Sequence, residues 1–257
     1  MRDFVRVLLR LGGAAALAAC ASGAPTSSAL TPEVDPKDPL AATRLMQQGQ
    51  ALVAEGKVPE GLERYRLAQQ LQPKNPTIYN LIGVAELRQR NAAKAVEAFN
   101  QALMLAPDYS DARNNRGAAY VQLNQFAQAE ADFLAVLGDS MHANRTGVYF
   151  NLGSMHFSRG NLNAAEENLR RAAVPSGPIE AFLLLGQVEE ALGRNDLAET
   201  AYREGIARAP ERVDLALALG KLVESAGRKD EAAEIYRRIV ALAPNSPEAQ
   251  QARARME

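Results

Sequence analysis

Residues 76–107 read PTIYNLIGVAELRQRNAAKAVEAFNQALMLAP, and this stretch decides the fold. It predicts two helices joined by a polar turn at Asn91, with Gly83 in the first helix and Ala95 in the second. These small residues allow the two helices to approach closely. Phe99 follows Ala95 by four positions, so both lie on one face of the second helix, where Phe99 fills the gap to the next unit. The stretch therefore predicts a helical hairpin.

The hairpin pattern recurs six times. The glycines equivalent to Gly83 are spaced by 34, 34, 36, 33 and 34 residues. The recurring positions are the glycines Gly49, Gly83, Gly117, Gly153, Gly186 and Gly220; the small residues Gly61, Ala95, Ala129, Ala165, Ala198 and Ala232; and the large residues Tyr65, Phe99, Phe133, Leu169, Tyr202 and Tyr236. Pro73, Pro107, Pro210 and Pro244 end second helices, because the residue before a proline disfavours the helical conformation. Six units in one register identify a repeat protein.

The pattern resembles the tetratricopeptide repeat. This resemblance implies an all-α fold, a right-handed superhelical solenoid of six tetratricopeptide repeats with a C-terminal capping helix, over residues 42–257. The predicted repeats span 42–75, 76–109, 110–143, 146–178, 179–212 and 213–246, and the cap spans 247–257. A polar cap suits the end of such an array, since terminal repeats need a soluble outer face. The composition agrees, because aromatic residues are only 5% and alanine supplies much of the apolar content.

The join between the third and fourth repeats departs from the pattern. Met141 stands where proline is usual, and Asn144 and Arg145 are additional residues. We expect a local change in the superhelical path here. The alternative is neutral drift in a surface loop.

The first twenty residues have the features of a lipoprotein signal. Arg2, Arg6 and Arg10 precede a short apolar segment at residues 11–19, which is too short to span a bilayer. Leu17-Ala18-Ala19-Cys20 resembles a lipobox, in which the cysteine receives a diacylglycerol and, after cleavage, an N-acyl chain such as palmitate. A buried structural cysteine beside an ordinary cleavage site is the alternative.

We therefore expect a signal peptide at residues 1–19 and a lipidated Cys20 that begins a disordered tether at residues 20–41. Apart from the covalent lipid on Cys20, no cofactor is expected. Ala21 is not an aspartate, so the predicted location is the periplasmic face of the outer membrane.

Catalytic patterns are missing from the sequence. His142 and His156 are the only histidines and do not have the spacing of a zinc helix, and there is no phosphate-binding loop or nucleophile elbow. We expect a protein that is not an enzyme and has no metal site or small-molecule substrate. A net charge of −1 gives no basic surface for nucleic acid.

The expected binding surface is the concave face lined by the first helix of each repeat. Its central part combines amides, which both donate and accept hydrogen bonds, with apolar side chains. The predicted peptide-binding groove consists of Asn80, Val84, Leu87, Asn114, Asn115, Val121, Phe150, Asn151 and Phe157. Farther along, the equivalent positions are Leu183, Leu184, Gln187, Glu190, Leu217, Lys221 and Glu224. The alternative is that the asparagines favour helix starts and the apolar residues pack between repeats.

A tether followed by six repeats resembles the type IV pilus biogenesis lipoproteins PilF, PilW and Tgl, the pilotins of secretin channels. The Asp139–Gly153 segment is similar in outline to the irregular join of that family, although it lacks the Tyr-Pro often found there. The resemblance implies a scaffold that holds a secretin or pilus assembly subunit and assists secretin assembly in the outer membrane. Two alternatives are a tight-adherence pilus lipoprotein of the TadD type and an NlpI-like adaptor for cell-wall hydrolases.

Overall fold

The computed structural model describes residue 38, residues 40–139 and residues 144–256, and all regular secondary structure in this part is α-helical. The helices are α1 (Ala41–Ala54), α2 (Val58–Leu71), α3 (Pro76–Arg88), α4 (Ala92–Leu105), α5 (Ser110–Gln122), α6 (Phe126–Gly138), α7 (Arg145–Ser158), α8 (Leu162–Ala172), α9 (Glu180–Ala191), α10 (Asn195–Arg208), α11 (Val213–Ser225), α12 (Lys229–Leu242) and α13 (Pro247–Met256). Each predicted repeat contains two of them. The all-α repeat fold is confirmed.

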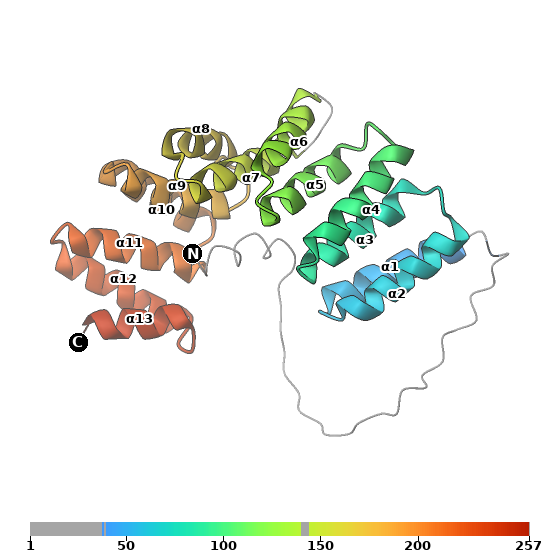
Figure 1. Cartoon of the computed structure of the whole chain (residues 1–257). Helices are drawn as coiled ribbons and strands as arrows, with labels where there is room; N and C mark the ends of the chain where they lie inside the picture. Colours follow the sequence, from blue (N-terminus) through green and yellow to red (C-terminus); the bar gives the residue numbers. More distant parts are fainter. Residues whose placement is uncertain (1–37, 39, 140–143, 257) are drawn as a thin grey trace, which may run out of the picture. The chain divides into compact units, whose positions relative to one another are not determined.

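The chain divides into two compact units, Met1–Asp132 and Phe133–Glu257, and the division lies inside α6. In the first unit α1 packs against α2 and α3 against α4, and α2–α3 and α4–α5 contacts join successive hairpins. In the second unit the same order runs from α7 to α13 (Figure 1). Within each unit, the two helices of a hairpin thus pack on each other, and the second helix also packs on the first helix of the next hairpin.

The recurring glycine and large residue meet in the hairpins of the first, second, fourth, fifth and sixth repeats. A Cβ atom added to Gly83 would lie 2.5 Å from Cε1 of Phe99, and one added to Gly186 would lie 2.2 Å from Cε1 of Tyr202. Phe99 is fully buried and belongs to a cluster with Ala119 of the following repeat. The large side chain therefore fills the gap to the next repeat, as predicted, and also packs on the glycine of its own hairpin.

The turn inside each hairpin uses one residue in the left-handed conformation. Glycine supplies it in four repeats, at Gly56, Gly160, Gly193 and Gly227, with φ between 75° and 82°. Asn124 does so in the third repeat with φ of 58°, and Arg90 in the second with φ of 64°. Asn91, the predicted turn residue of the second repeat, lies one position later. Its side chain instead binds the carboxylate of Glu86.

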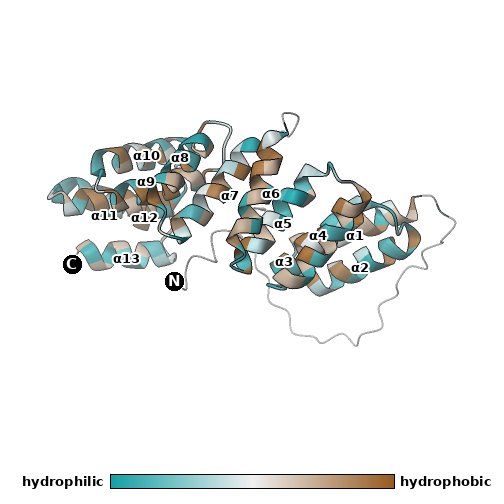
Figure 2. Ribbon diagram, turned by 45° about the horizontal axis from the view of Figure 1, so that its top comes forward, coloured by the Kyte–Doolittle hydropathy of each residue, from teal (hydrophilic) through white to brown (hydrophobic). Residues whose placement is uncertain are grey.

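The capping helix α13 packs against α12 and α11. Ala249 and Ala252 are fully buried, and the Oγ atom of Ser246 accepts a hydrogen bond from the Ala249 amide at 3.0 Å. The rest of the helix is largely polar (Figure 2). The capping helix is therefore present with the polar outer face that the sequence predicted.

Several predicted features lie outside the described residues. They include the signal peptide, Cys20, most of the tether, Met141 and His142. Asn144 is the first described residue after this gap in the join. It caps α7 by accepting a hydrogen bond from the Gly147 amide at 3.1 Å. The expected change of path at the join stays a prediction.

Candidate protein-binding surfaces

An amide ladder links α3 and α5 in the first unit. Asn115 donates from Nδ2 to Oδ1 of Asn80 at 3.0 Å, and Asn80 donates from Nδ2 to the Tyr109 hydroxyl at 3.3 Å. Asn80 is only 9% exposed. Each polar end of its amide has one partner within the protein, so Asn80 orients Asn115. The predicted role of Asn80 in peptide binding stays a prediction.

The apolar groove residues of the first unit are half-buried. Val84 and Leu87 on α3 pack against the cluster that contains Phe99, and Val121 lies near the end of α5. Asn114 is also half-buried and is engaged in an interaction. Each of these side chains keeps some exposed surface, so their role in peptide binding stays a prediction.

The remaining groove residues belong to α7 in the second unit. Phe150 is fully buried in the core, and its predicted role in peptide binding stays a prediction. Asn151 and Phe157 are half-buried and engaged in interactions. Because a helix presents residues one position apart in different directions, neighbouring Phe150 and Asn151 need not share a surface.

A buried carboxylate ties α8 to α9. Glu189 is 1% exposed, and it accepts a hydrogen bond from Nη2 of Arg170 at 2.8 Å and pairs with Nε of Arg194 at 2.9 Å. Glu166 also pairs with both arginines, which closes a ring of four charges. A carboxylate at this depth is tolerated because it is paired and hydrogen-bonded. Its role is to hold two repeats together.

Glu86 occupies the equivalent position in the second repeat. It is 4% exposed, accepts a hydrogen bond from Nδ2 of Asn91 at 2.9 Å, and lies 3.7 Å from the guanidinium of Arg66. Sequence reasoning missed both carboxylates. The available signal is an acidic residue five positions before a polar turn residue and about twenty after an arginine of the preceding repeat.

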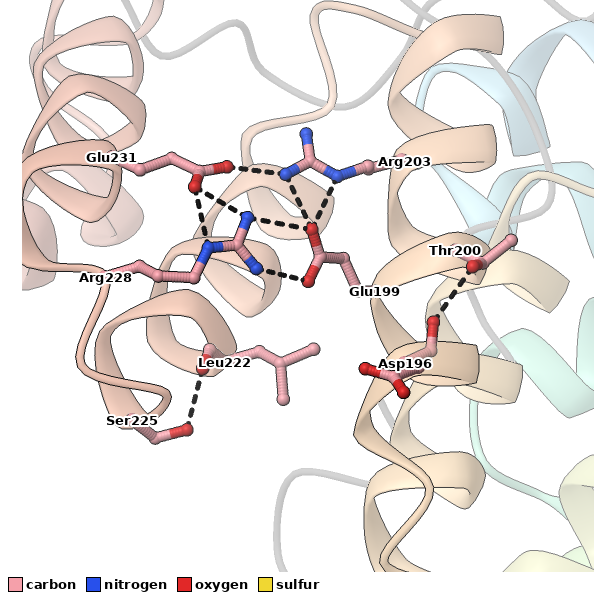
Figure 3. A network of polar contacts seen from close by, with 8 residues as sticks. All are labelled: Asp196, Glu199, Thr200, Arg203, Leu222, Ser225, Arg228 and Glu231. Atoms are coloured by element: carbon pink, nitrogen blue, oxygen red, sulfur yellow. Dashed lines mark hydrogen bonds and ion pairs between the residues drawn. The ribbon is translucent and has the colours of Figure 1, made fainter.

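A second ionic network joins two exposed arginines and two half-buried glutamates of the last two repeats. Figure 3 shows Glu199 and Arg203 of α10 joined to Arg228 and Glu231 at the start of α12. Arg228 donates to Glu199 at 2.7 Å, and the Arg228 hydrogen bond is the largest cause that holds the pKa of Glu199 below its usual value. Both glutamates of this network form ion pairs with its two arginines, so neither carboxylate lacks a cationic partner. The network therefore links the fifth and sixth repeats.

The helical repeats match a known protein family. The family model "Tetratricopeptide repeat" matches residues 46–112, 114–178 and 183–247, which is more than half of the chain. The chain belongs to the tetratricopeptide-repeat family. Proteins of this family are generally non-catalytic scaffolds that bind protein partners.

Solved tetratricopeptide-repeat structures share the fold over most of the chain. PilW, a widely conserved type IV pilus biogenesis factor, superposes with a TM-score of 0.72 at 23% identity, covering 82% of this chain and 97% of PilW. The pilF protein of Pseudomonas aeruginosa gives a TM-score of 0.68 at 18% identity, covering 83% of this chain and 96% of pilF.

Curated relatives match shorter stretches. The lipoprotein NlpI homolog of Haemophilus influenzae is 36% identical over 76 residues, and mouse tetratricopeptide repeat protein 16 is 26% identical over 190 residues. The chain spans about a quarter of the length of each, 24% and 25% respectively.

The described residues contain neither a candidate membrane span nor a candidate metal cluster. Among them no helix is both long and apolar enough to cross a membrane. The same residues include no group of three His, Cys, Asp or Glu side chains arranged to hold a metal ion. His156 is 8% exposed and packs within its repeat.

Proposed function

We propose that this protein is a membrane-anchored, protein-binding scaffold, a type IV pilus biogenesis lipoprotein that assists secretin assembly in the outer membrane. The observation that carries the proposal is the extent of the structural match. PilW and pilF are covered almost from end to end, 97% and 96%, so the likeness involves a whole repeat array of the same length. A match to some of the repeats of a larger scaffold would cover only part of that larger protein.

The sequence supplies the second half of the proposal. A lipid on Cys20 places the repeats at a membrane, and residues 21–41 extend at most about 70 Å at 3.3–3.6 Å per residue. The repeats then hold a segment of the secretin while the lipid brings it to the bilayer. Two or more acyl chains give the stable anchoring that this mechanism needs.

The experiment is a gene deletion complemented by two variants. Deletion should abolish assembled secretin multimers, and Cys20→Ser should release the protein from the membrane fraction and fail to restore the multimers. Ser28→Ala is the matched control and should restore both. Normal multimers in the deletion strain would refute the assembly role, and membrane retention of Cys20→Ser would refute the anchor.

A second candidate is an adaptor for cell-wall hydrolases. The 36% identity to the lipoprotein NlpI homolog favours it, although the match covers 29% of this chain. Affinity purification from the envelope separates the two. Endopeptidases without a secretin would support the adaptor, and a secretin would support the pilus role.

A further inference from the structure

A hollow of about 310 Å³ opens between α9, α11 and α13 in the second unit. Leu183 on α9 and Leu217 and Ala218 on α11 form its apolar part. The polar lining consists of Gln187, Glu190, Tyr202, Asp214, Lys221, Glu248 and Gln251. The hollow therefore offers apolar contacts beside charged groups.

The charges that line the hollow are not all compensated. Asp214 forms two hydrogen bonds with Arg212, at 2.9 and 2.7 Å, which neutralises it. Lys221 donates to the amide oxygen of Gln251 at 2.9 Å. Glu190 accepts a hydrogen bond from the Tyr202 hydroxyl, and within the described residues neither Glu190 nor Glu248 is paired with a cation. The hydrogen bond to Gln251 leaves the charge of Lys221 in place, so Glu190 and Glu248 give the hollow one net negative charge.

The next repeat shows what such a carboxylate binds. Glu224 is equivalent to Glu190, 34 residues later, and accepts a hydrogen bond from the Tyr236 hydroxyl at 2.8 Å, as Glu190 does from Tyr202. Glu224 also accepts one from Nη1 of Arg255 at 2.6 Å. The tyrosine holds the carboxylate in place, and a guanidinium occupies the open side.

One repeat earlier, among the described residues, no cation contacts the carboxylate, although the equivalent position also carries a cationic side chain. The residue equivalent to Arg255 is Lys221, which is bonded to Gln251. Glu190 therefore presents a tyrosine-oriented oxygen to the hollow where its counterpart has an arginine. An arginine from outside would restore the arrangement seen at Glu224.

We propose that this hollow binds an arginine side chain from an extended segment of the protein partner, with an adjacent apolar residue against Leu183 and Leu217. The arginine is placed against Glu190, and Glu248 adds a second negative charge. Charged hydrogen bonds to a carboxylate are strongest for a guanidinium, which is planar and donates two parallel bonds. The proposal rests on the proposed function only in assuming a protein partner, and it adds the chemistry by which that partner is recognised.

The test is affinity selection from a defined peptide pool by the full-length protein in detergent. The probe is an equal mixture of two heptapeptide pools with random flanking residues. One pool has arginine at the central position, and the other has citrulline, which has the same shape but no charge. Arginine peptides should be recovered in excess, with leucine-like neighbours enriched. Glu190→Gln should reduce that preference by about tenfold, the effect of losing one charged hydrogen bond.

Glu234→Gln is the matched control, because Glu234 is exposed on α12 and away from the lining of the hollow. It should keep the full preference, and circular dichroism should show that both variants are folded. Equal recovery of arginine and citrulline peptides by the wild type would overturn the proposal, as would an unchanged preference in Glu190→Gln. The secretin-multimer assay in the deletion strain tests the proposed function separately. The proposed function and the proposed arginine site can therefore fail independently of each other.

Discussion

Replacing Gly83 by alanine tests the packing that defines the repeat. The added Cβ would lie 2.5, 2.7 and 2.7 Å from three ring atoms of Phe99, and that ring is fully buried. Overpacking a core costs about 1–3 kcal/mol. Alanine gains about 1 kcal/mol over glycine inside a helix, so the net loss should be up to about 2 kcal/mol.

Gly138→Ala is the matched control, because a Cβ at that position of α6 would have nothing within 4 Å. Gly138→Ala also gains stability from the higher helix propensity of alanine, although this gain is smaller at a helix end, and it introduces no steric clash. The difference between the two variants in free energy of unfolding should therefore approach the clash itself, about 1–3 kcal/mol.

The assay is chemical denaturation followed by circular dichroism, with hydrogen exchange on peptides from α3 and α4 to locate the change. Phe99→Leu should relieve the clash, so combining it with Gly83→Ala should cost less than the sum of the two single variants. If Gly83→Ala is as stable as Gly138→Ala, the packing argument is refuted.

Three further predictions concern the turns, the buried charges and the tyrosines. Arg90→Gly should stabilise the protein by about 1–2 kcal/mol, because a left-handed conformation costs that much for a residue with a side chain, and an unchanged denaturation midpoint would contradict this. Glu189→Gln should cost about 1–3 kcal/mol, because a buried side chain loses its charged hydrogen bond with Arg170 and its ion pair with Arg194, whereas the exposed Glu167→Gln should cost at most about 0.5 kcal/mol in the same assay. Burial and the hydrogen bond to Glu224 raise the pKa of Tyr236 to about 12, so its contribution to stability is complete below pH 10 and is lost as the pH rises to about 12. Tyr236→Phe should flatten the fall in unfolding free energy over that range, and an equally steep fall would contradict the assignment.

The repeat framework could be predicted because it depends on local spacing. A glycine, a small residue and a large side chain at constant intervals can meet only if the helices pair as hairpins, and Gly83 with Phe99 shows that contact. The position of the left-handed turn residue was less predictable. Arg90 adopts a left-handed conformation that its side chain disfavours, so residue type alone does not predict it.

The binding surface was harder to predict because exposure depends on neighbouring repeats. Asn80 and Phe150 share the repeat position expected to face a ligand, yet one amide is used inside the protein and the ring is buried. The carboxylate of Glu190 shows the opposite case. It lies at an expected groove position, but only the three-dimensional comparison with Glu224 reveals that Lys221 is bonded to Gln251 and not to this carboxylate.

In-cell cross-linking of the full-length protein, followed by purification from the envelope and mass spectrometry, tests the central claim most directly. The account predicts cross-linked peptides that join the repeats to a secretin of the type IV pilus. Cross-links to cell-wall endopeptidases with no secretin peptide would contradict it.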